Sequence, residues 1–180
     1  MDISKISIGK KAPEEVNIII ENPMGGLPVK YEMDKDSGAL EVDRFIHTPM
    51  FYPGNYGFIP HTLSDDGDPV DVIAIGQLPV MPGAVMAVKP IGVLLMEDDG
   101  GKDEKIIARP IDKLFPYHKD VNDFTDIQPI LREQIEHFFT HYKDLEKGKW
   151  VKIGGWDNAD RARTLIQEGI ARLQAQKSAA

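Results

Sequence analysis

A short acidic segment carries the residues best suited to chemistry. The chain reads Asp65-Asp66-Gly67-Asp68-Pro69-Val70-Asp71, which places four carboxylates within seven residues. Gly67 permits a tight turn and Pro69 stiffens the exit into an apolar run, so this first acidic segment can converge its carboxylates on one point. Such crowded acids need a neutralising cation, and their hard oxygens suit a divalent metal. The alternative is a solvated loop. A calcium-binding EF-hand is excluded, because the twelfth position counted from Asp66 is Gln77 rather than glutamate.

A second acidic segment spans residues 97–105 and reads Glu97-Asp98-Asp99-Gly100-Gly101-Lys102-Asp103-Glu104-Lys105. Residues 65–71 hold four acids and no base, and residues 97–105 hold five acids and two bases, so nearly all of the net charge of −8 lies here. Taken alone, the second segment is typical of a solvated hairpin tip. If the fold brings both segments together, they supply enough oxygens for two or more Mg²⁺ ions, which prefer a few carboxylates plus water and phosphate.

Cationic and phenolic side chains accompany the acids. Lys30 and Glu32 have the same parity in a predicted strand and therefore project from one face. Arg44 ends the next predicted strand. The run Phe51-Tyr52-Pro53-Gly54-Asn55-Tyr56-Gly57-Phe58 is rich in aromatic and turn residues. We expect a loop here, in which the phenylalanines pack and the tyrosine hydroxyls are free to bond phosphate oxygens.

Composition indicates an ordinary globular protein. The 180 residues, 42% hydrophobic and 28% charged, predict a single domain over residues 1–180. The absence of cysteine excludes disulfides, thiol catalysis and cysteine-ligated zinc. Apolar runs such as Val93–Met96 are far below the ~20 residues of a membrane span, and the N-terminal stretch lacks the apolar core of a secretory signal. We therefore expect a cytoplasmic protein with no membrane association, and the acidity argues against a nucleic-acid partner.

Turn residues divide the first two thirds of the chain into short strands. The predicted strands are Val16–Glu21, Val29–Asp34, Leu40–Phe45, Val70–Ile75, Val85–Met96 (bent near Pro90), Lys105–Arg109 and Trp150–Ile153. The segment Lys35-Asp36-Ser37-Gly38 predicts a hairpin turn between the second and third of these. Many short strands at this spacing favour a sandwich or barrel.

Helical spacing appears in the last third. Apolar residues at positions 131, 135, 138, 142 and 145 predict a helix over 130–145. Tyr142 falls on this stripe, so its plain interpretation is a core residue. A second helix is predicted over Ala159–Gln174, with Asp157 or Asn158 as its cap and a frayed tail over residues 176–180. The expected fold class is α+β and β-dominated, with two main C-terminal helices.

Several motifs in this order resemble family I soluble inorganic pyrophosphatases, particularly the bacterial members. The segments that carry the resemblance are Lys30-Tyr31-Glu32, Gly38-Ala39-Leu40-Glu41-Val42-Asp43-Arg44, Phe51–Gly57, Asp66-Gly67-Asp68-Pro69-Val70-Asp71-Val72, His141-Tyr142-Lys143-Asp144-Leu145-Glu146, Lys149-Trp150-Val151-Lys152 and Gly155-Trp156. The resemblance covers roughly residues 14–170.

This resemblance implies a five-stranded OB-like barrel flanked by helices, and Mg²⁺-dependent hydrolysis of pyrophosphate to two orthophosphates by a metal-activated water. It also implies a homohexamer, built as a dimer of trimers. The family often has other residues at Gly25-Gly26-Leu27, so the resemblance assigns that loop no role.

Carried over by position, the resemblance also implies a role for each site residue. Asp66, Asp71 and Asp103 would bind a first metal, Asp71 would also reach a second, and Asp98 and Asp103 would bind a metal that arrives with substrate. Outer carboxylates acting through water would be Glu21 and Glu32. Phosphate-binding groups would be Lys30, Arg44, Tyr56, Lys105, Tyr142 and Lys143. Asp68 would be the acid/base partner of the attacking water.

The implied reaction agrees with simple electrostatics. Pyrophosphate is highly anionic and repels an anionic nucleophile, so shared metals must cancel charge and acidify a water. A carboxylate such as Asp68 can then take or orient the proton, while lysine and arginine stabilise the leaving phosphate. We expect Asp71→Asn to nearly abolish turnover, and to raise thermal stability in metal-free buffer by relieving repulsion among the acids.

Three other interpretations remain open from the residues alone. His137 and His141 lie one helical turn apart on a face that includes Glu133, which fits a subunit interface, a solvated face or a zinc pair lacking a third ligand. The second open interpretation concerns the function: the chain could be a non-catalytic OB barrel that binds metal or nucleic acid, instead of a pyrophosphatase. The third is a broader nucleotide phosphohydrolase, which the absence of a P-loop motif disfavours.

Overall fold

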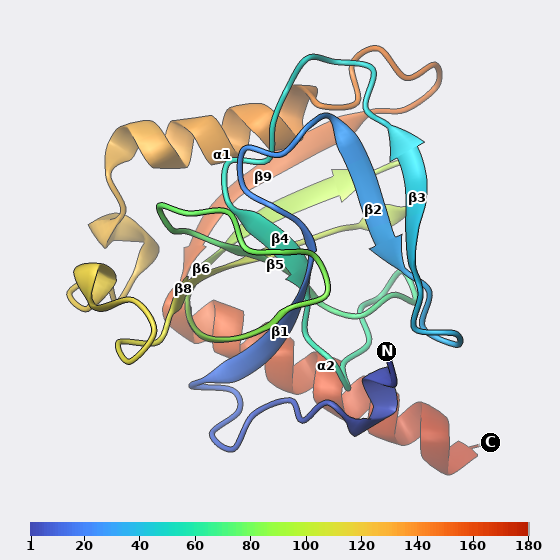
Figure 1. Ribbon diagram of the computed structural model, residues 1–180, viewed down its shortest axis with the longest axis vertical. Coiled ribbons are helices and arrows are strands. Elements are labelled where there is room, and N and C mark those ends of the chain that lie inside the picture. Colours follow the sequence, from blue (N-terminus) through green and yellow to red (C-terminus); the bar gives the residue numbers. More distant parts are fainter. Residues whose placement is uncertain (180) are drawn as a thin grey trace.

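The computed structural model describes residues 1–179 and contains a seven-stranded sheet, a separate two-stranded ribbon and two long helices (Figure 1). The strands are β1 (Val16–Asn22), β2 (Val29–Met33), β3 (Leu40–Phe45), β4 (Asn55–Phe58), β5 (Asp71–Ala74), β6 (Val85–Asp98), β7 (Gly101–Lys102), β8 (Lys105–Pro110) and β9 (Val151–Asn158). The helices are α1 (Pro129–His141), α2 (Ala159–Ala179) and the short 3₁₀ turns η1 (Ile3–Lys5), η2 (Pro116–His118) and η3 (Phe124–Asp126).

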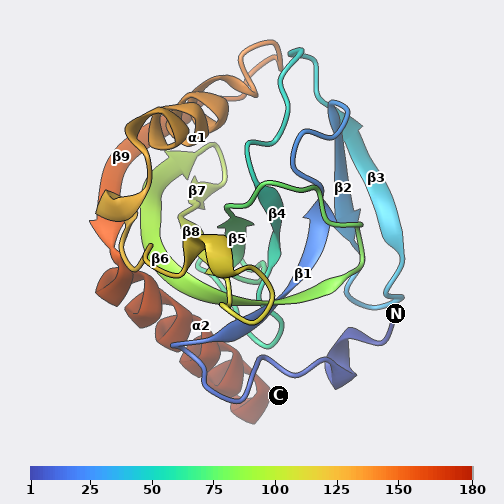
Figure 2. The same ribbon diagram turned by 60° about the vertical axis from the view of Figure 1, so that its left-hand side comes forward.

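Five strands close on themselves. Their order is β1-β4-β5-β8-β6, and β6 pairs again with β1, which completes a ring (Figure 2). All of these pairings are antiparallel except that of β5 with β8, which is parallel. The long strand β6 shifts register between Pro90 and Gly92, as its predicted bend requires, and also pairs with β7 and β9. This ring, with two flanking helices, confirms the predicted β-dominated α+β fold.

The alternation of side chains along the ring separates two apolar clusters. Val72, Ala74 and Ile106 lie in a cluster that α2 completes with Ala162 and Ile166. Residues of the opposite parity, including Ile73 and Ile107, lie in a second cluster completed by Ile135, Phe138, Phe139 and Tyr142 from α1 and its end. Because strand side chains point alternately to the two faces, each helix covers a different face of the same strands.

The ribbon of β2 and β3 stands beside the ring and makes no strand pairing with it (Figure 1). The turn after Asp34 closes through hydrogen bonds from the Asp34 and Gly38 amides, as predicted, with Gly38 at a φ of 68°. Asn22 of β1 joins the ribbon to the ring. Its side-chain amide donates to the Tyr31 carbonyl over 2.9 Å, and its oxygen accepts from the Tyr31 amide over 2.8 Å.

Several predicted boundaries were wrong. Part of the aromatic run expected as a loop is strand β4, which pairs with both β1 and β5. Phe58 packs in the core as expected, but Phe51 is 54% exposed. Helix α1 ends at His141, because the chain turns after the Tyr142 cap, and Leu145 is exposed.

The C-terminal part of the chain is more regular than predicted. Strand β9 extends to Asn158, because Gly155 adopts a φ of 107° and the β6 register shifts beside it. Asn158 caps α2 as predicted, by accepting from the Arg161 amide over 2.9 Å. Helix α2 continues to Ala179 where a frayed tail was expected; Ala180 lies outside the described residues. In residues 1–179 no helix has the length and apolar character needed to cross a membrane.

Candidate active site

The two acidic segments meet in one pocket of about 320 Å³, here called the acidic pocket. Its lining is Lys30, Arg44, Tyr52, Tyr56, Asp66, Asp68, Asp71, Asp98, Asp99, Gly100, Asp103, Lys105, Phe139, Tyr142, Lys143 and Lys149. Every predicted site residue except Glu21 and Glu32 is among them. The polar side chains therefore come together from the ring, the ribbon and the end of α1.

The first acidic segment forms the loop that leads into β5. The Ser64 amide donates to the Asp68 carbonyl over 2.6 Å, and the Asp68 amide donates to the Asp66 carboxylate over 3.0 Å. Gly67 has a φ of 97°, which glycine adopts without steric cost. Asp71 is the first residue of β5. The expected compact turn is present, and it holds Asp66 and Asp68 on the side of the pocket where β5 begins.

The second acidic segment is the hairpin that joins β6 to β8. Its tip is solvated, but Asp98 and Asp103 point inward, with side chains 13% and 14% exposed. The Asp103 amide donates to the Met96 carbonyl over 3.0 Å, and the Gly100 amide donates to the Asp98 carboxylate over 2.7 Å. Parallel pairing of β5 with β8 starts both strands on the same side, which brings Asp71 beside Lys105. The hairpin is thus part of the pocket wall.

Lys105 lies at the centre of the acids. Its side chain is 3% exposed and donates to Asp71 over 2.5 Å, to Asp103, and to the Tyr56 hydroxyl over 3.4 Å. Burial lowers the pKa of the Lys105 ammonium, but Asp71 and Asp103 outweigh burial and hold that pKa well above its usual value. Lys105 is therefore a permanent cation bonded to two of the predicted metal ligands.

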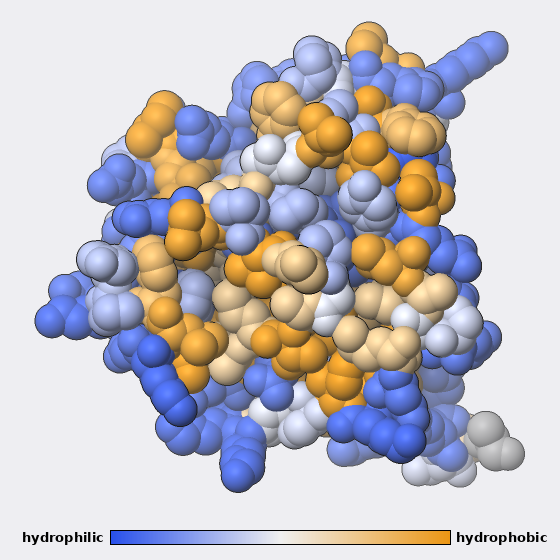
Figure 3. All heavy atoms as spheres, in the orientation of Figure 1, coloured by the Kyte–Doolittle hydropathy of each residue, from blue (hydrophilic) through white to orange (hydrophobic). Residues whose placement is uncertain are grey.

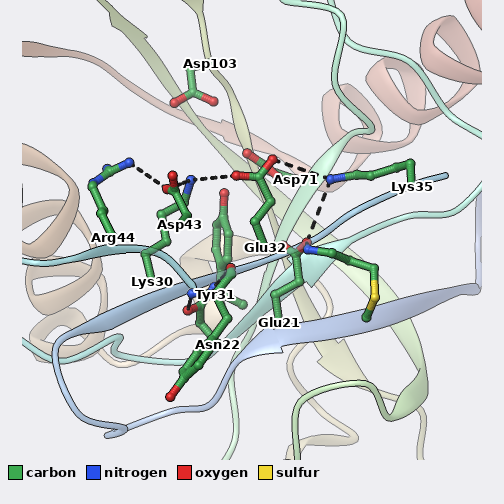
Figure 4. A network of polar contacts seen from close by, with 12 residues as sticks. Glu21, Asn22, Lys30, Tyr31, Glu32, Lys35, Asp43, Arg44, Asp71 and Asp103 are labelled. Atoms are coloured by element: carbon green, nitrogen blue, oxygen red, sulfur yellow. Dashed lines mark hydrogen bonds and ion pairs between the residues drawn. The ribbon is translucent and has the colours of Figure 1, made fainter. Parts of the chain in front are cut away.

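The other cations of the pocket each have a carboxylate partner, and Figure 4 shows the partners of Lys30 and Arg44. Asp43 accepts from Lys30 and from Arg44, each over 2.9 Å. Lys143 donates to Asp98 over 2.5 Å. Burial raises the pKa of Asp98. The hydrogen bonds from Lys143 and from the Gly100 amide lower it by more, so the net shift of this pKa is downward. The predicted common face of Lys30 and Glu32 is confirmed, since their charged groups lie 3.5 Å apart.

Buried tyrosines complete the pocket. Tyr56 and Tyr142 are 6% exposed, and Tyr142 stacks on Phe138 with ring centroids 5.1 Å apart. Burial, followed by the charge of Asp71, raises the pKa of Tyr56 well above its usual value, so that this hydroxyl stays protonated and can donate. Tyr142 packs in the apolar cluster completed by α1, as its place on the helical stripe predicted, and its side chain also lines the pocket.

Comparison with known proteins decides the family. The sequence profile described as inorganic pyrophosphatase matches residues 18–174. The chain is 61% identical to an inorganic pyrophosphatase of Agrobacterium fabrum over 98% of this chain and 99% of that protein. The chain belongs to the inorganic pyrophosphatase family. It is therefore an enzyme, rather than a non-catalytic barrel that binds metal or nucleic acid.

Solved structures of pyrophosphatases support the fold. A structure from Anaplasma phagocytophilum, described as an inorganic phosphatase, matches with a TM-score of 0.93 and 48% identity, covering 94% of this chain and 99% of that one. The inorganic pyrophosphatase of Thermus thermophilus matches with a TM-score of 0.90 and 41% identity, covering 97% of this chain and 99% of that one. The expected resemblance to bacterial members of the pyrophosphatase family is confirmed.

Glu21 and Glu32 lie at the junction of the ring and the ribbon, outside the pocket lining. Glu21 is 4% exposed and accepts from the Met33 amide over 2.8 Å. Burial raises its pKa to about 7 against the opposing effect of that amide. Glu32 faces Lys30 and Lys35. Both glutamates are drawn with Asp71 in Figure 4, and the charge of Asp71 is a further cause that raises the pKa of Glu21. This location, behind the pocket lining, is compatible with the outer carboxylates implied for pyrophosphatases.

The donor set fits a hard divalent cation. Among residues 1–179, the ion pairs leave Asp66 and Asp68 without a lysine or arginine partner. Burial, followed by the charges of Asp103 and Asp71, raises the pKa of Asp66. In the same residues, however, no three carboxylate or histidine side chains are close enough to enclose a metal. Lys105 bonds one oxygen of Asp71 and one oxygen of Asp103, which leaves the second oxygen of each carboxylate available to another partner.

Sequence reasoning did not assign several charged residues that lie in or beside the acidic pocket. Asp99 and Lys149 both line it and pair over 2.5 Å, and Glu146 accepts from Arg44 over 3.1 Å. Asp43 links Lys30 and Arg44. Asp43, Glu146 and Lys149 belong to motifs that carried the resemblance, which was the available signal for them.

Proposed function

We propose that this chain hydrolyses pyrophosphate to two orthophosphates in the acidic pocket, with Mg²⁺ as its metal. The observation that carries the proposal is the meeting of both acidic segments with the predicted phosphate-binding groups in a single pocket. An excess of acids can hold metals and a smaller set of cations can hold phosphate, so both parts of a metal–pyrophosphate complex find partners there.

In this proposal the acids divide into direct and indirect metal ligands. Asp66, Asp71 and Asp103 bind a first Mg²⁺, Asp71 also serves a second, and Asp98 and Asp103 hold one that accompanies the substrate. Glu21 and Glu32 act through water from the junction of the ring and the ribbon. When bound, Mg²⁺ would neutralise the substrate's charge and lower the pKa of the attacking water.

The cations and tyrosines hold the phosphate oxygens. The assigned residues are Lys30, Arg44, Tyr56, Lys105, Tyr142 and Lys143. Positive groups that are fixed before the reaction stabilise the charge that develops on the leaving phosphate. Arg44, held between Asp43 and Glu146, is fixed in this way. Tyr56 contributes a neutral donor.

Asp68 is assigned to the proton of the attacking water. Its carboxylate is exposed, and its loop directs it to the pocket that also contains Asp66 and Asp71. A carboxylate with no cationic partner is free to accept and later release a proton.

A single assay tests the proposal. Orthophosphate release is measured from pyrophosphate, from ATP and without substrate, each with and without Mg²⁺. Release from pyrophosphate that needs Mg²⁺ and far exceeds release from ATP is the expected result. Comparable release from both substrates would favour the nucleotide phosphohydrolase.

The proposed assembly is a homohexamer. Figure 3 shows apolar side chains spread across the middle of one face, which the loop of residues 75–84 crosses in Figure 1. Leu78 and Met81 of that loop are 70% and 79% exposed. A groove of about 650 Å³ is lined by Met24, Gly25, Met50, Phe51, Tyr52, Pro53, Ile130, Glu133, Gln134, His137 and Phe138. Exposed apolar surface on this scale is typical of subunit contacts.

The histidines of α1 provide a test of the assembly. His137 and His141 have ring centroids 4.6 Å apart; His137 lines the groove beside Glu133, and His141 bonds Asp144 over 2.8 Å. Histidines commonly gain charge between pH 8 and 5, so a contact containing both should weaken in acid. Sedimentation at pH 7.5 and 5.0 is compared for the native protein and the His137→Gln/His141→Gln variant. Equal dissociation of both would exclude the histidines as the cause.

The proposal also treats residues 1–180 as one cytoplasmic domain. Both apolar clusters use β5, β6 and β8, which supports a single cooperative unit, and calorimetry should show one unfolding transition. The chain has no cysteine and so requires no oxidising compartment. Cell fractionation tests the location.

A further inference from the structure

The loop that carries Asp66 and Asp68 is held at its base by a side chain from far along the sequence. Within the loop, the Thr62 hydroxyl accepts from the Val70 amide over 2.9 Å, and Ser64 pairs with the Asp68 carbonyl. These bonds close the loop on itself. They tie the base of the loop beside Asp71, because Val70 directly precedes that residue, but they include no contact from outside the loop. The negative charges of Asp71 and Asp103 oppose the approach of Asp66.

Helix α2 provides the attachment. The Leu63 amide donates to the Gly169 carbonyl over 3.0 Å. A Cβ at Gly169 would lie 2.8 Å from Val70 Cγ2 and 3.3 Å from the Leu63 carbonyl, so the helix backbone meets both ends of the loop closely. In Figure 1 the chain between β4 and β5 descends beside α2.

Arg172, one turn further along α2, holds the loop by two bonds. One guanidinium nitrogen donates to the Leu63 carbonyl over 2.5 Å, and the other lies 2.7 Å from the Asp65 carboxylate. Arg172 is 36% exposed and Asp65 54%. The planar guanidinium therefore bridges a backbone group and a side chain on the residues that directly precede Asp66.

We propose that Arg172 is a positioning residue that sets the place of Asp66 and Asp68 in the acidic pocket. It touches neither substrate nor metal and acts through Leu63 and Asp65. The inference rests on the proposed function, since it takes Asp66 as a metal ligand. These two bonds of Arg172, to Leu63 and to Asp65, are here called the clamp. Losing the clamp should let the acidic loop move away from Asp71 and Asp103, which should reduce metal affinity more than it reduces the stability of the fold.

Metal binding without substrate is the first test. Binding of Mn²⁺ alone is measured by equilibrium dialysis on the intact protein, followed by the Mg²⁺ dependence of pyrophosphate hydrolysis. For Arg172→Gln we expect the Mn²⁺ concentration at half-saturation and the Mg²⁺ concentration at half-maximal hydrolysis each to rise about 3- to 10-fold. This is the effect of losing two half-exposed bonds to a charged group. The kcat at saturating Mg²⁺ should stay within about two-fold, because the metal restores the loop position. Arg172→Lys keeps the positive charge but loses the two-pronged guanidinium, so its metal binding should be intermediate between that of the native protein and that of Arg172→Gln.

Arg163→Gln is the matched control. Arg163 lies on the same helix and pairs with Asp160, away from the loop. It should change the melting temperature as much as Arg172→Gln does, but leave Mn²⁺ binding unaltered. Wild-type Mn²⁺ binding by Arg172→Gln, or an equal loss in Arg163→Gln, would overturn the inference.

Two further variants keep the test decisive. If Arg172→Gln does not fold, Asp65→Asn removes only the carboxylate half of the clamp and should weaken Mn²⁺ binding about two- to three-fold; unchanged binding would overturn the inference. Asp66→Asn separates the two proposals. If it binds Mn²⁺ like the native protein, the metal role of Asp66 fails; if it loses binding while Arg172→Gln does not, only the positioning role fails.

Discussion

The ring and the β2–β3 ribbon hold the two sides of the acidic pocket in different ways. Asp71, Asp98 and Lys105 lie at the ends of ring strands that pair on both sides. Lys30 and Arg44 lie on the ribbon, which has no strand pairing with the ring. The ribbon is attached by the Asn22 amide, by the bond from the Met33 amide to Glu21 and by the ion pairs of Lys35 with Glu21 and of Arg44 with Glu146. Met33 also packs against Ile19 and Phe58 of the ring.

This difference separates the proposed metal-binding acids from two of the proposed phosphate-binding cations. Of the acids proposed to hold metals, Asp71 and Asp98 lie at the ends of strands whose geometry is set by backbone pairing, while Asp66 and Asp103 lie in the loops beside them. The proposed phosphate-binding residues Lys30 and Arg44 lie on the ribbon, which side-chain contacts, and no strand pairing, attach to the ring. Changes in the ring should therefore abolish the reaction, whereas changes at the ribbon attachment should mainly alter substrate affinity.

The largest effect is expected from Asp71→Asn in the ring. Turnover should fall at least about 10³-fold, since the amide cannot supply charge to two metals. The structure reverses the earlier expectation of higher stability. Asp71 bonds the buried Lys105, so its loss should cost about 1–3 kcal/mol in metal-free buffer. Steady-state assays and thermal melts measure both effects.

Asp112→Asn is the control for Asp71→Asn. Asp112 also pairs over 2.5 Å with a buried cation, Arg109, but lies outside the acidic pocket. It should lower the melting temperature while retaining activity. Near-native activity of Asp71→Asn at low-millimolar Mg²⁺ would contradict the metal role of Asp71.

A smaller effect is expected from Tyr142→Phe, at the end of α1. The aromatic side chain at position 142 stays packed on Phe138, and only its hydroxyl is lost. A hydrogen bond to a charged oxygen contributes about 1.5–3 kcal/mol, so kcat/KM should fall roughly 10- to 200-fold. Tyr117→Phe, at an exposed site, is the control. Native kinetics for Tyr142→Phe would leave Tyr142 as a core residue alone.

Asn22→Ala tests the ribbon attachment directly. It frees both backbone groups of Tyr31 and should let Lys30 move, which raises KM about 5- to 10-fold while kcat changes less. Asn17→Ala is matched, because Asn17 also lies on β1 but bonds Ser7. A fall in kcat with unchanged KM would show that the ribbon does not act through substrate affinity.

Glu21, which joins the ring to the ribbon, should make the stability of the fold depend on pH. Burial raises the pKa of Glu21 from 4.5 to about 7. The folded state therefore binds this proton more tightly than the unfolded state, so the stabilisation is complete below pH 4.5 and is lost as the pH rises through about 7. Between pH 5 and pH 8, the free energy of unfolding of Glu21→Gln should therefore rise by about 1–3 kcal/mol relative to that of the native protein.

Urea unfolding at both pH values with chelator present measures this gain. Glu14→Gln, at an exposed position, is the control and should show no such change. A constant difference between Glu21→Gln and the native protein would show that Glu21 does not titrate with unfolding.

Local patterns predicted most of the elements, and motif order predicted the pocket. Four of the five ring strands and both helices follow from apolar spacing and from caps such as Asn158. Strand β4 was missed because its neighbours Pro53 and Gly54 are turn residues, and its pairing with β1 and β5 depends on distant segments. The bonding of Lys105 to Asp71 depends on the parallel pairing of β5 with β8. The clamp of Arg172 on Leu63 spans 109 residues, a separation at which no local spacing rule applies.

Closure of the ring also affects how the molecule meets other chains. A strand at the edge of a sheet offers unpaired backbone groups that can recruit a foreign strand and begin aggregation. Pairing β6 with β1 leaves no such edge within the ring. Strands β7 and β9 are edges of the sheet; β7 has only two residues, and β9 is interrupted by Gly155 at a φ of 107° and carries Lys152 and Asp157. Strand β3 of the ribbon pairs on one side only, and it exposes Leu40, Val42 and Phe45 between its charged residues. The ring thus offers no strand edge, whereas β3 is an edge to which another chain could add.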